Sequence, residues 1–231
     1  MLVKNWMCRD VITIDENKSM QKAIELIKEN DIRMLPVMKD DQLVGIVTDR
    51  DLKRASASDA TTLEVHELFY LLSKIKVKDI MTKNPITVTE DLTIEETSEI
   101  LLENKISGAP VVDRSGKIVG TITQTDIFKV LISLTGVGAR GMQYALELED
   151  RPGSIKDIAD IIRNFGGRIV SIMSTSNGAQ TGKRKVYIRG FGISRENLDA
   201  LKRQLDEEAK VLYMIDHREN RREIYSDPLT P

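Results

Sequence analysis

The sequence predicts an α+β protein made of two β-α-β-β-α repeats followed by a separate β-α-β-β-α-β unit. Three observations support this prediction. The first half of the chain repeats itself, each repeat combines strand-like and helix-like apolar spacing, and a second series of strands and helices begins after residue 140. A chain of 231 residues is long enough to bury a core in each part.

The internal repeat is visible by direct comparison of short segments. Residues 7–14 (MCRDVITI) recur as residues 81–88 (MTKNPITV), at an offset of 74. After a one-residue insertion in the turn at 113–116, residues 44–51 (VGIVTDRD) match residues 119–126 (VGTITQTD) at an offset of 75. A β-hairpin tolerates an insertion best in its turn. The first half therefore holds two copies of one unit.

Each element of the first repeat follows from its local pattern. Residues 11–14 predict a short strand, and Ser19 is placed to cap a helix whose apolar residues follow i, i+3, i+4, i+7 spacing. Two β-rich runs, 35–38 and 43–48, flank a polar turn and predict a hairpin. A second helix is expected to begin near residues 49–51. One such unit is too small to bury its own faces, so we expect it to pair with its twin.

The motif shared by the two repeats resembles a known family. A hydrophobic-x-Pro-Val step, at Pro36 and Pro110, is followed by Gly-h-h-Thr-x-x-Asp at residues 45–51 and 120–126. This pattern resembles a tandem pair of CBS domains, known as a Bateman module, over about residues 5–134.

A glycine-rich segment separates the repeats from the rest of the chain. Residues 136–141 (GVGARG) fit the dinucleotide-binding pattern G-x-G-x-x-G. That fingerprint needs a strand before the glycines and a helix after them. Here a helix-like run, 127–134, comes first and a strand-like run, 142–149, comes next. The segment is therefore interpreted as a flexible interdomain linker.

The remaining elements follow the order β-α-β-β-α-β of a ferredoxin-like fold. Strands are predicted at 142–149, 168–174, 184–190 and 211–215, with one helix carrying Ile155, Ile158, Ala159 and Ile162 on one face and another beginning at Ser194. With residues 150–153 (DRPG) closing the first strand, this part resembles an ACT domain, a regulatory fold that often binds amino acids at subunit interfaces.

These observations fix the expected domain boundaries. They are residues 1–60 for the first CBS repeat, 61–76 for a linker helix, 77–135 for the second repeat, 136–141 for the glycine-rich linker, 142–217 for the ACT-like domain and 218–231 for a flexible tail. The linker helix is interpreted as packing on the CBS pair, with partner binding as the alternative.

Composition excludes several classes of protein. Lys and Arg total 34 against 36 for Asp and Glu, so there is no basic surplus for nucleic-acid binding. With only Cys8, His66 and His217 available, neither a disulfide scaffold nor a Cys/His zinc site is expected, and we find no catalytic constellation. No run approaches the ~18 apolar residues of a membrane span, so we expect a soluble, cytoplasmic protein.

The CBS resemblance implies an adenosine-containing ligand between the repeats, such as AMP, ADP, ATP or S-adenosylmethionine. Asp51 and Asp126 resemble the ribose-binding aspartates of nucleotide-binding CBS pairs, because one carboxylate accepts hydrogen bonds from two vicinal hydroxyls. The family pattern adds Thr48 and Arg50 near the phosphates of the first site, Thr123 and Thr125 in the second, and around the base Thr13, Met34, Leu35, Pro36, Thr87, Gly108, Ala109 and Pro110. Because Thr125 replaces Arg50, the two sites should differ. The alternative is that Thr48 and Asp51 simply cap a helix.

In the ACT-like domain, the loop of Asp150, Arg151, Pro152 and Gly153 is the candidate amino-acid site. A ligand carboxylate would dock on backbone N–H groups there, and a tight turn without a ligand is the alternative.

The whole architecture resembles the acetoin-utilisation AcuB-like regulatory proteins. That resemblance implies a non-catalytic ligand sensor, and exposed faces in both parts predict a homodimer. Two alternatives stay open: a ligand-free dimerising adaptor, and a nucleotide-related enzyme resembling inosine monophosphate dehydrogenase. The enzyme is disfavoured because its barrel alone needs about 250 residues.

Overall fold

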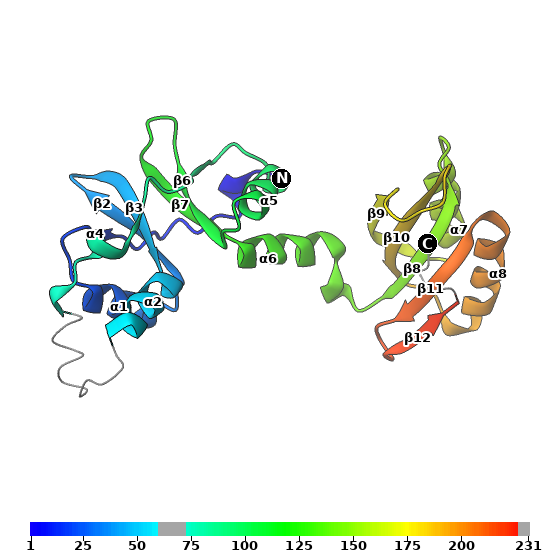
Figure 1. The fold of residues 1–231 in the computed structure, drawn as a ribbon. Helices are drawn as coiled ribbons and strands as arrows, with labels where there is room; N and C mark the ends of the chain where they lie inside the picture. The colour runs from blue at the N-terminus through cyan, green and yellow to red at the C-terminus, as the bar shows by residue number, and fades with distance from the viewer. Residues whose placement is uncertain (60–72, 226–231) are drawn as a thin grey trace. The chain divides into compact units, whose positions relative to one another are not determined.

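The computed structural model describes residues 1–59 and 73–225, which form two compact units, Met1–Phe128 and Lys129–Pro231 (Figure 1). The division falls inside a helix, Gln124–Thr135, rather than at the predicted glycine-rich linker. Most of the predicted linker helix, together with His66, lies outside the described residues.

The first repeat contains the predicted elements in the predicted order. They are η1 (Val3–Asn5), β1 (Ile14–Asp15), α1 (Met20–Glu29), β2 (Met34–Lys39), β3 (Gln42–Thr48) and α2 (Asp49–Asp59). Ser19 caps α1 as expected, its hydroxyl accepting a hydrogen bond from the Lys22 N–H at 3.2 Å. The strand predicted at residues 11–14 is wrong in extent. Only Ile14 and Asp15 pair with β2, so β1 is limited to these two residues.

The second repeat has the same plan. Its elements are α4 (Val77–Ile80), β4 (Thr82–Lys83), β5 (Val88–Thr89), α5 (Ile94–Glu103), β6 (Gly108–Val112), β7 (Ile118–Thr123) and α6 (Gln124–Thr135). α5 begins with a complete capping box. The Thr93 hydroxyl accepts from the Glu96 N–H at 3.1 Å, and the Glu96 carboxylate accepts from the Thr93 N–H at 2.7 Å.

The two repeats exchange their leading segments. β4 of the second repeat pairs with β3 of the first and completes the sheet β1-β2-β3-β4. In return, Cys8 of the first repeat exchanges two backbone hydrogen bonds of 2.9 Å with Thr121 on β7. The Met81 sulfur lies against Gly45 and the Met7 sulfur against Gly120, where any larger side chain would collide. Each repeat is therefore completed by the other, as expected of twins that cannot bury their own faces.

The core of the first repeat reflects this exchange. It consists of Ile14, Met20, Ala23, Leu35, Val37, Val47, Leu52 and Val77. Val77 belongs in sequence to the second repeat and is fully buried in this cluster. Burying apolar side chains from both repeats stabilises them as one folding unit.

The second unit is one antiparallel sheet covered by two helices (Figure 1). Its elements are η2 (Val137–Ala139), β8 (Met142–Glu149), α7 (Ser154–Asn164), β9 (Arg168–Thr175), β10 (Lys183–Phe191), η3 (Arg195–Asn197), α8 (Leu198–Glu208), β11 (Lys210–Asp216) and β12 (Arg221–Ile224). The strand order is β12-β11-β8-β10-β9, and α7 and α8 pack on one face around Tyr144, Leu146, Ile162 and Leu205. The order of elements from β8 to β11 agrees with the predicted β-α-β-β-α-β series.

Two predicted flexible segments have regular structure instead. The predicted tail from residue 218 contains β12, which pairs with β11 from Tyr213–Ile224 to Asp216–Arg221. The charge of these residues led to the prediction of a flexible tail, but an edge strand pairs through its backbone and tolerates charged side chains.

The glycine-rich linker forms the turn η2 and contacts the second unit. Gly136 has φ +63° beside Val170, and Gly141 lies against the Gly190 carbonyl.

Candidate functional site

An open cleft of about 460 Å³ lies between the two repeats of the first unit. It is lined by Met34, Ile46, residues 48–51 and Arg54 from the first repeat, and by Thr82, residues 84–86 and residues 105–108 from the second. Its volume falls within the roughly 300–1,000 Å³ usual for small-molecule sites. The cleft combines apolar walls, carboxylates and cations, so it suits a ligand with both apolar and charged parts.

The end of β3 and the start of α2 hold Asp51 in a fixed position. Its Oδ2 accepts hydrogen bonds from the Thr48 N–H at 2.9 Å and from the Thr48 hydroxyl at 2.6 Å, while the Asp51 N–H donates to the Thr48 hydroxyl at 3.3 Å. This is the helix cap that we considered as the alternative. The other carboxylate oxygen, Oδ1, has no hydrogen bond to the described part of the chain. The cap therefore occupies one oxygen and leaves the second available to a ligand.

The second repeat reproduces this geometry between Thr123 and Asp126. The Asp126 Oδ2 accepts from the Thr123 N–H at 3.0 Å and from the Thr123 hydroxyl at 2.7 Å, and the Asp126 N–H donates to that hydroxyl at 3.3 Å. Both β-α corners are thus built in the same way.

Five of the predicted ligand-binding residues line the cleft: Met34, Thr48, Arg50, Asp51 and Gly108. The structure keeps the others out of this cleft: Leu35, Pro36, Ala109 and Pro110 are buried, Thr13 and Thr87 are exposed elsewhere, and Thr123, Thr125 and Asp126 lie at the corresponding corner of the second repeat. Of the two predicted Thr–Asp corners, the cleft therefore contains only the one formed by Thr48 and Asp51.

Sequence reasoning missed several lining residues. Arg54 lies one helical turn after Asp51 on α2, and Lys105 follows α5 in the second repeat. The i, i+3 spacing was a usable signal for Arg54. Lys105 had none, because only the pairing of the two repeats brings it to the cleft.

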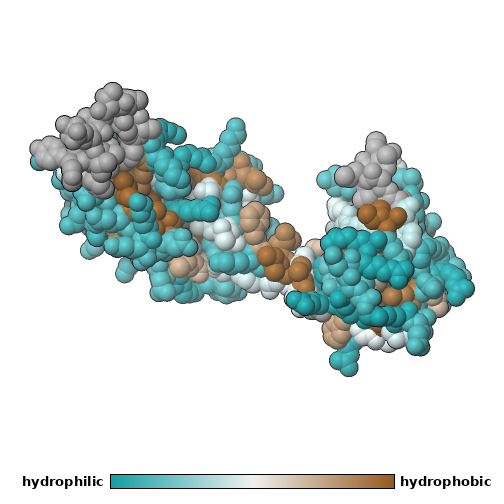
Figure 2. All heavy atoms as spheres, turned by 90° about the horizontal axis from the view of Figure 1, so that it is seen from below, coloured by the Kyte–Doolittle hydropathy of each residue, from teal (hydrophilic) through white to brown (hydrophobic). Residues whose placement is uncertain are grey.

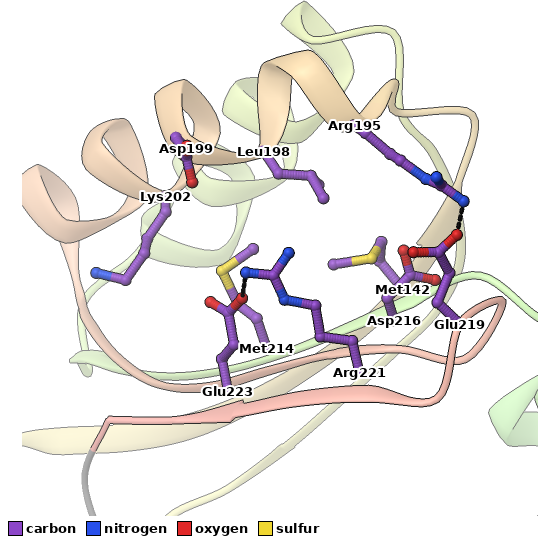
Figure 3. A pocket seen from close by; sticks show the side chains of 10 residues that line it. All are labelled: Met142, Arg195, Leu198, Asp199, Lys202, Met214, Asp216, Glu219, Arg221 and Glu223. Atoms are coloured by element: carbon purple, nitrogen blue, oxygen red, sulfur yellow. Dashed lines mark ion pairs between the residues drawn. The ribbon is translucent and has the colours of Figure 1, made fainter.

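The second unit has a smaller cavity, of about 140 Å³, between α8 and the strands β11 and β12 (Figure 3). Met142 and Met214 project into it, and four of its charged side chains form two ion pairs: Arg195 with Glu219, and Arg221 with Glu223 at 2.5 Å. Lys202 pairs at 2.5 Å with Asp206, which is outside the lining. Asp216 is held by Arg218 at 2.6 Å, a hydrogen bond that lowers the pKa of this carboxyl. These groups satisfy one another, so the cavity offers little to a ligand.

The predicted amino-acid loop, Asp150 to Gly153, connects β8 to α7. The Arg151 guanidinium is engaged by Asp157 at 3.0 Å and by Glu149 at 3.7 Å, and the Ser154 N–H donates to the Arg151 carbonyl. The neighbouring hollow is lined by six carboxylate side chains and three cationic ones. This surplus of carboxylates disfavours docking of a ligand carboxylate there.

No group of three or more His, Cys, Asp or Glu side chains among residues 1–59 and 73–225 is arranged to hold a metal ion. Within the same ranges, no helix has the length and apolarity needed to cross a membrane.

Comparison with known proteins places the first unit in a family. The family model described as "CBS domain" matches twice, at residues 3–58 and 77–133. A CBS domain-containing protein of Dictyostelium discoideum is 31% identical over 135 residues, which cover 58% of this chain and 93% of that protein. A solved CBS domain pair in complex with 5′-methylthioadenosine and S-adenosyl-L-methionine is 30% identical, with a TM-score of 0.49, covering 57% of this chain and 99% of that one.

Enzymes share only this region. The inosine-5′-monophosphate dehydrogenase of Korarchaeum cryptofilum is 38% identical over 125 residues, which are 54% of this chain but only 23% of the enzyme. The shared part is the CBS region, so the similarity does not extend to the rest of the enzyme. With two matching domains and a relative covered almost from end to end, the chain belongs to the CBS domain-containing proteins.

Proposed function

We propose that the chain is a non-catalytic regulatory sensor, and that the cleft beside Asp51 binds an adenosine-containing nucleotide. The observation that carries the proposal is the Asp51 carboxylate. Its Oδ2 is fixed by Thr48, and its Oδ1 has no partner in the described part of the chain. A carboxylate held in this way can accept hydrogen bonds from a ribose diol without losing conformational freedom on binding.

The rest of the cleft suits the remaining parts of such a nucleotide. Met34, Ile46 and Ile106 supply apolar surface for a base, while the cationic side chains supply contacts for phosphate. Because these residues come from both repeats, a ligand would favour one arrangement of the CBS pair. The size of that effect is limited by the difference in the ligand's affinity for the two arrangements.

The test is a thermal-shift panel on the full chain with AMP, ADP, ATP, NADH, S-adenosylmethionine and cyclic dinucleotides, followed by titration calorimetry. A ligand at ~100 times its dissociation constant should add about 2.7 kcal/mol of stability. Asp51→Asn keeps a capping oxygen but removes the charge, and should weaken binding by about ten-fold or more.

Asp79→Asn is the matched control. Asp79 caps α4 by accepting from the Lys76 N–H at 3.1 Å, and it does not line the cleft. It should leave ligand affinity unchanged. A flat panel, or equal effects of the two substitutions, would contradict the nucleotide proposal.

A homodimer is the second part of the proposal, and a ligand-free dimerising adaptor is the alternative function. Exposed apolar side chains gather along α6, near the middle of Figure 2: Phe128, Leu131, Ile132 and Leu134 are each about half exposed or more. A second copy would remove this surface from water. Phe128→Asp should shift sedimentation from dimer to monomer, whereas Leu102→Asp, at a side chain of α5 that is 70% exposed, should not. A wild-type monomer would contradict the dimer.

We further propose the ACT-like assignment of the second unit and an AcuB-like role in acetoin utilisation. The support is the β-α-β-β-α-β order from β8 to β11 and its position after a CBS pair. Deleting the gene in its organism of origin should slow growth on acetoin but leave growth on glucose unchanged. Equal growth of the deletion strain and its parent on acetoin would contradict this role.

A further inference from the structure

Three cationic side chains surround the cleft: Arg50 and Arg54 from α2, and Lys105 from the segment after α5. All three are exposed, so they are accessible to a ligand entering from solvent. Asp49 and Asp51 are the carboxylates of the same lining, so the cleft carries a net charge of +1.

The repeat does not reproduce this charge. At the offset of 75, Arg50 corresponds to Thr125 and Arg54 to Lys129; at the offset of 74, Lys105 corresponds to Asp31. Two of the three cations are therefore replaced, one by a neutral side chain and one by a carboxylate.

Counting every lining position confirms the difference. The positions that correspond to the cleft lining carry two cations, Arg33 and Lys129, against three carboxylates, Asp10, Asp31 and Asp126. Their net charge is −1, which is two charges more negative than the cleft. The hydrogen-bonded corner for a ribose is present in both repeats, but the cationic surroundings occur in only one.

Building on the proposed function, we infer that the Asp51 cleft selects adenosine ligands by their phosphate groups, and that the corresponding positions around Asp126 do not. Each chain then binds one phosphorylated nucleotide. Arg50 and Arg54 lie on successive positions of one helical face, and Lys105 lies across the cleft in the other repeat. Phosphate oxygens would accept charge-assisted hydrogen bonds from both sides and hold the repeats together.

The test compares adenosine, AMP and ATP by calorimetry on the full chain. Affinity should rise from adenosine to ATP, with about one ATP bound per chain. The advantage of ATP should shrink between 50 mM and 500 mM salt, because exposed charges are screened. Arg54→Gln should weaken ATP binding by about ten-fold and change adenosine binding by less than about two-fold.

Lys105→Asp is the most informative variant, because it introduces into the cleft the residue type found at the corresponding position of the first repeat, Asp31. Lys105 has φ +54° and Asp31 has φ +49°, so the backbone at this position already accommodates Asp in the repeat. It should remove most of the preference for ATP over adenosine. Lys22→Gln is the control: this cation is on α1 and pairs with Glu25 at 3.1 Å, and neither residue lines the cleft.

The outcomes separate this inference from the proposed function. If adenosine and ATP bind equally well and neither Arg54→Gln nor Lys105→Asp changes their ratio, the charge inference is wrong while the nucleotide site stands. If two ATP molecules bind per chain with similar affinity, the inference is also wrong. If no adenosine compound binds, the proposed function itself fails.

Discussion

The two CBS repeats share one set of hydrogen bonds and differ in the charges around it. The Thr48–Asp51 and Thr123–Asp126 corners agree to 0.1 Å in each of their three hydrogen bonds. Around them, Arg50 and Lys105 of the first cleft correspond to Thr125 and Asp31. The cap is needed for the helix to begin, so it is present in both repeats, whereas the surrounding charges are free to differ. We therefore propose that ligand choice depends on the residues around the shared Thr–Asp corner rather than on the corner itself.

The largest expected effect separates the two corners directly. Asp51→Asn should weaken ATP binding by about ten-fold or more, whereas Asp126→Asn should change it by less than about two-fold, because the net charge of the surroundings is positive only at the first corner. Calorimetric titration of both variants measures the difference. Equal losses would show that the two corners bind ATP alike and would remove the distinction between the repeats.

Replacing the glycine that contacts the other repeat's leading segment should lower the free energy of unfolding by a similar amount in both repeats. An alanine at Gly45 would press on the Met81 side chain and approach the Thr82 carbonyl to 3.1 Å, and one at Gly120 would press on Met7 and approach the Cys8 carbonyl to 3.0 Å. Each substitution should cost about 1–3 kcal/mol through overpacking.

Denaturant unfolding followed by fluorescence of Trp6, the single tryptophan, measures both costs in the first unit. If only one of Gly45→Ala and Gly120→Ala is destabilising, the two leading segments do not pack equally tightly on the opposite repeats, and this prediction is wrong.

The smallest effect distinguishes the first helices of the repeats. Ser19→Ala and Thr93→Ala should each cost about 1 kcal/mol, with Thr93→Ala the larger because α5 has a capping box and α1 does not. The backbone N–H of Thr93, followed by its hydroxyl, lowers the pKa of Glu96, so this contribution is present above the carboxyl's ordinary pKa and is lost as pH falls through the lowered one. Thr93→Ala keeps the backbone hydrogen bond and removes the one that the hydroxyl donates to the Glu96 carboxylate at 2.8 Å, so its excess cost should disappear in acid. An excess that persists at all pH values would contradict this account.

The sequence predicted the elements of both units well, because apolar spacing and caps are local signals. Ser19, the hairpins and the second helices were all visible in the chain. Of the cleft, it predicted Met34, Gly108 and the three motif residues Thr48, Arg50 and Asp51. Lys105 was missed because its place depends on the pairing of the repeats, which no local pattern records.

The errors have a common physical cause. β12 was taken for a flexible tail because its residues are charged, yet its pairing with β11 uses backbone groups that composition does not reveal. The glycines of residues 136–141 were interpreted as flexibility, whereas Gly136 and Gly141 allow close contact with Val170 and Gly190. The strand depends on a hairpin between backbone groups and the glycines on contacts with residues distant in sequence, and composition reveals neither.

The exchange of leading segments also bears on how this arrangement arose. Two identical copies of a single repeat that swapped their first residues would form the same pair, with true two-fold symmetry. In such a symmetric ancestor, every substitution in one cleft must appear in the other, so both would have carried the same charge. Joining the copies in one polypeptide removed that constraint. Within one polypeptide the two copies can carry different residues at corresponding positions, as Arg50 and Thr125 do.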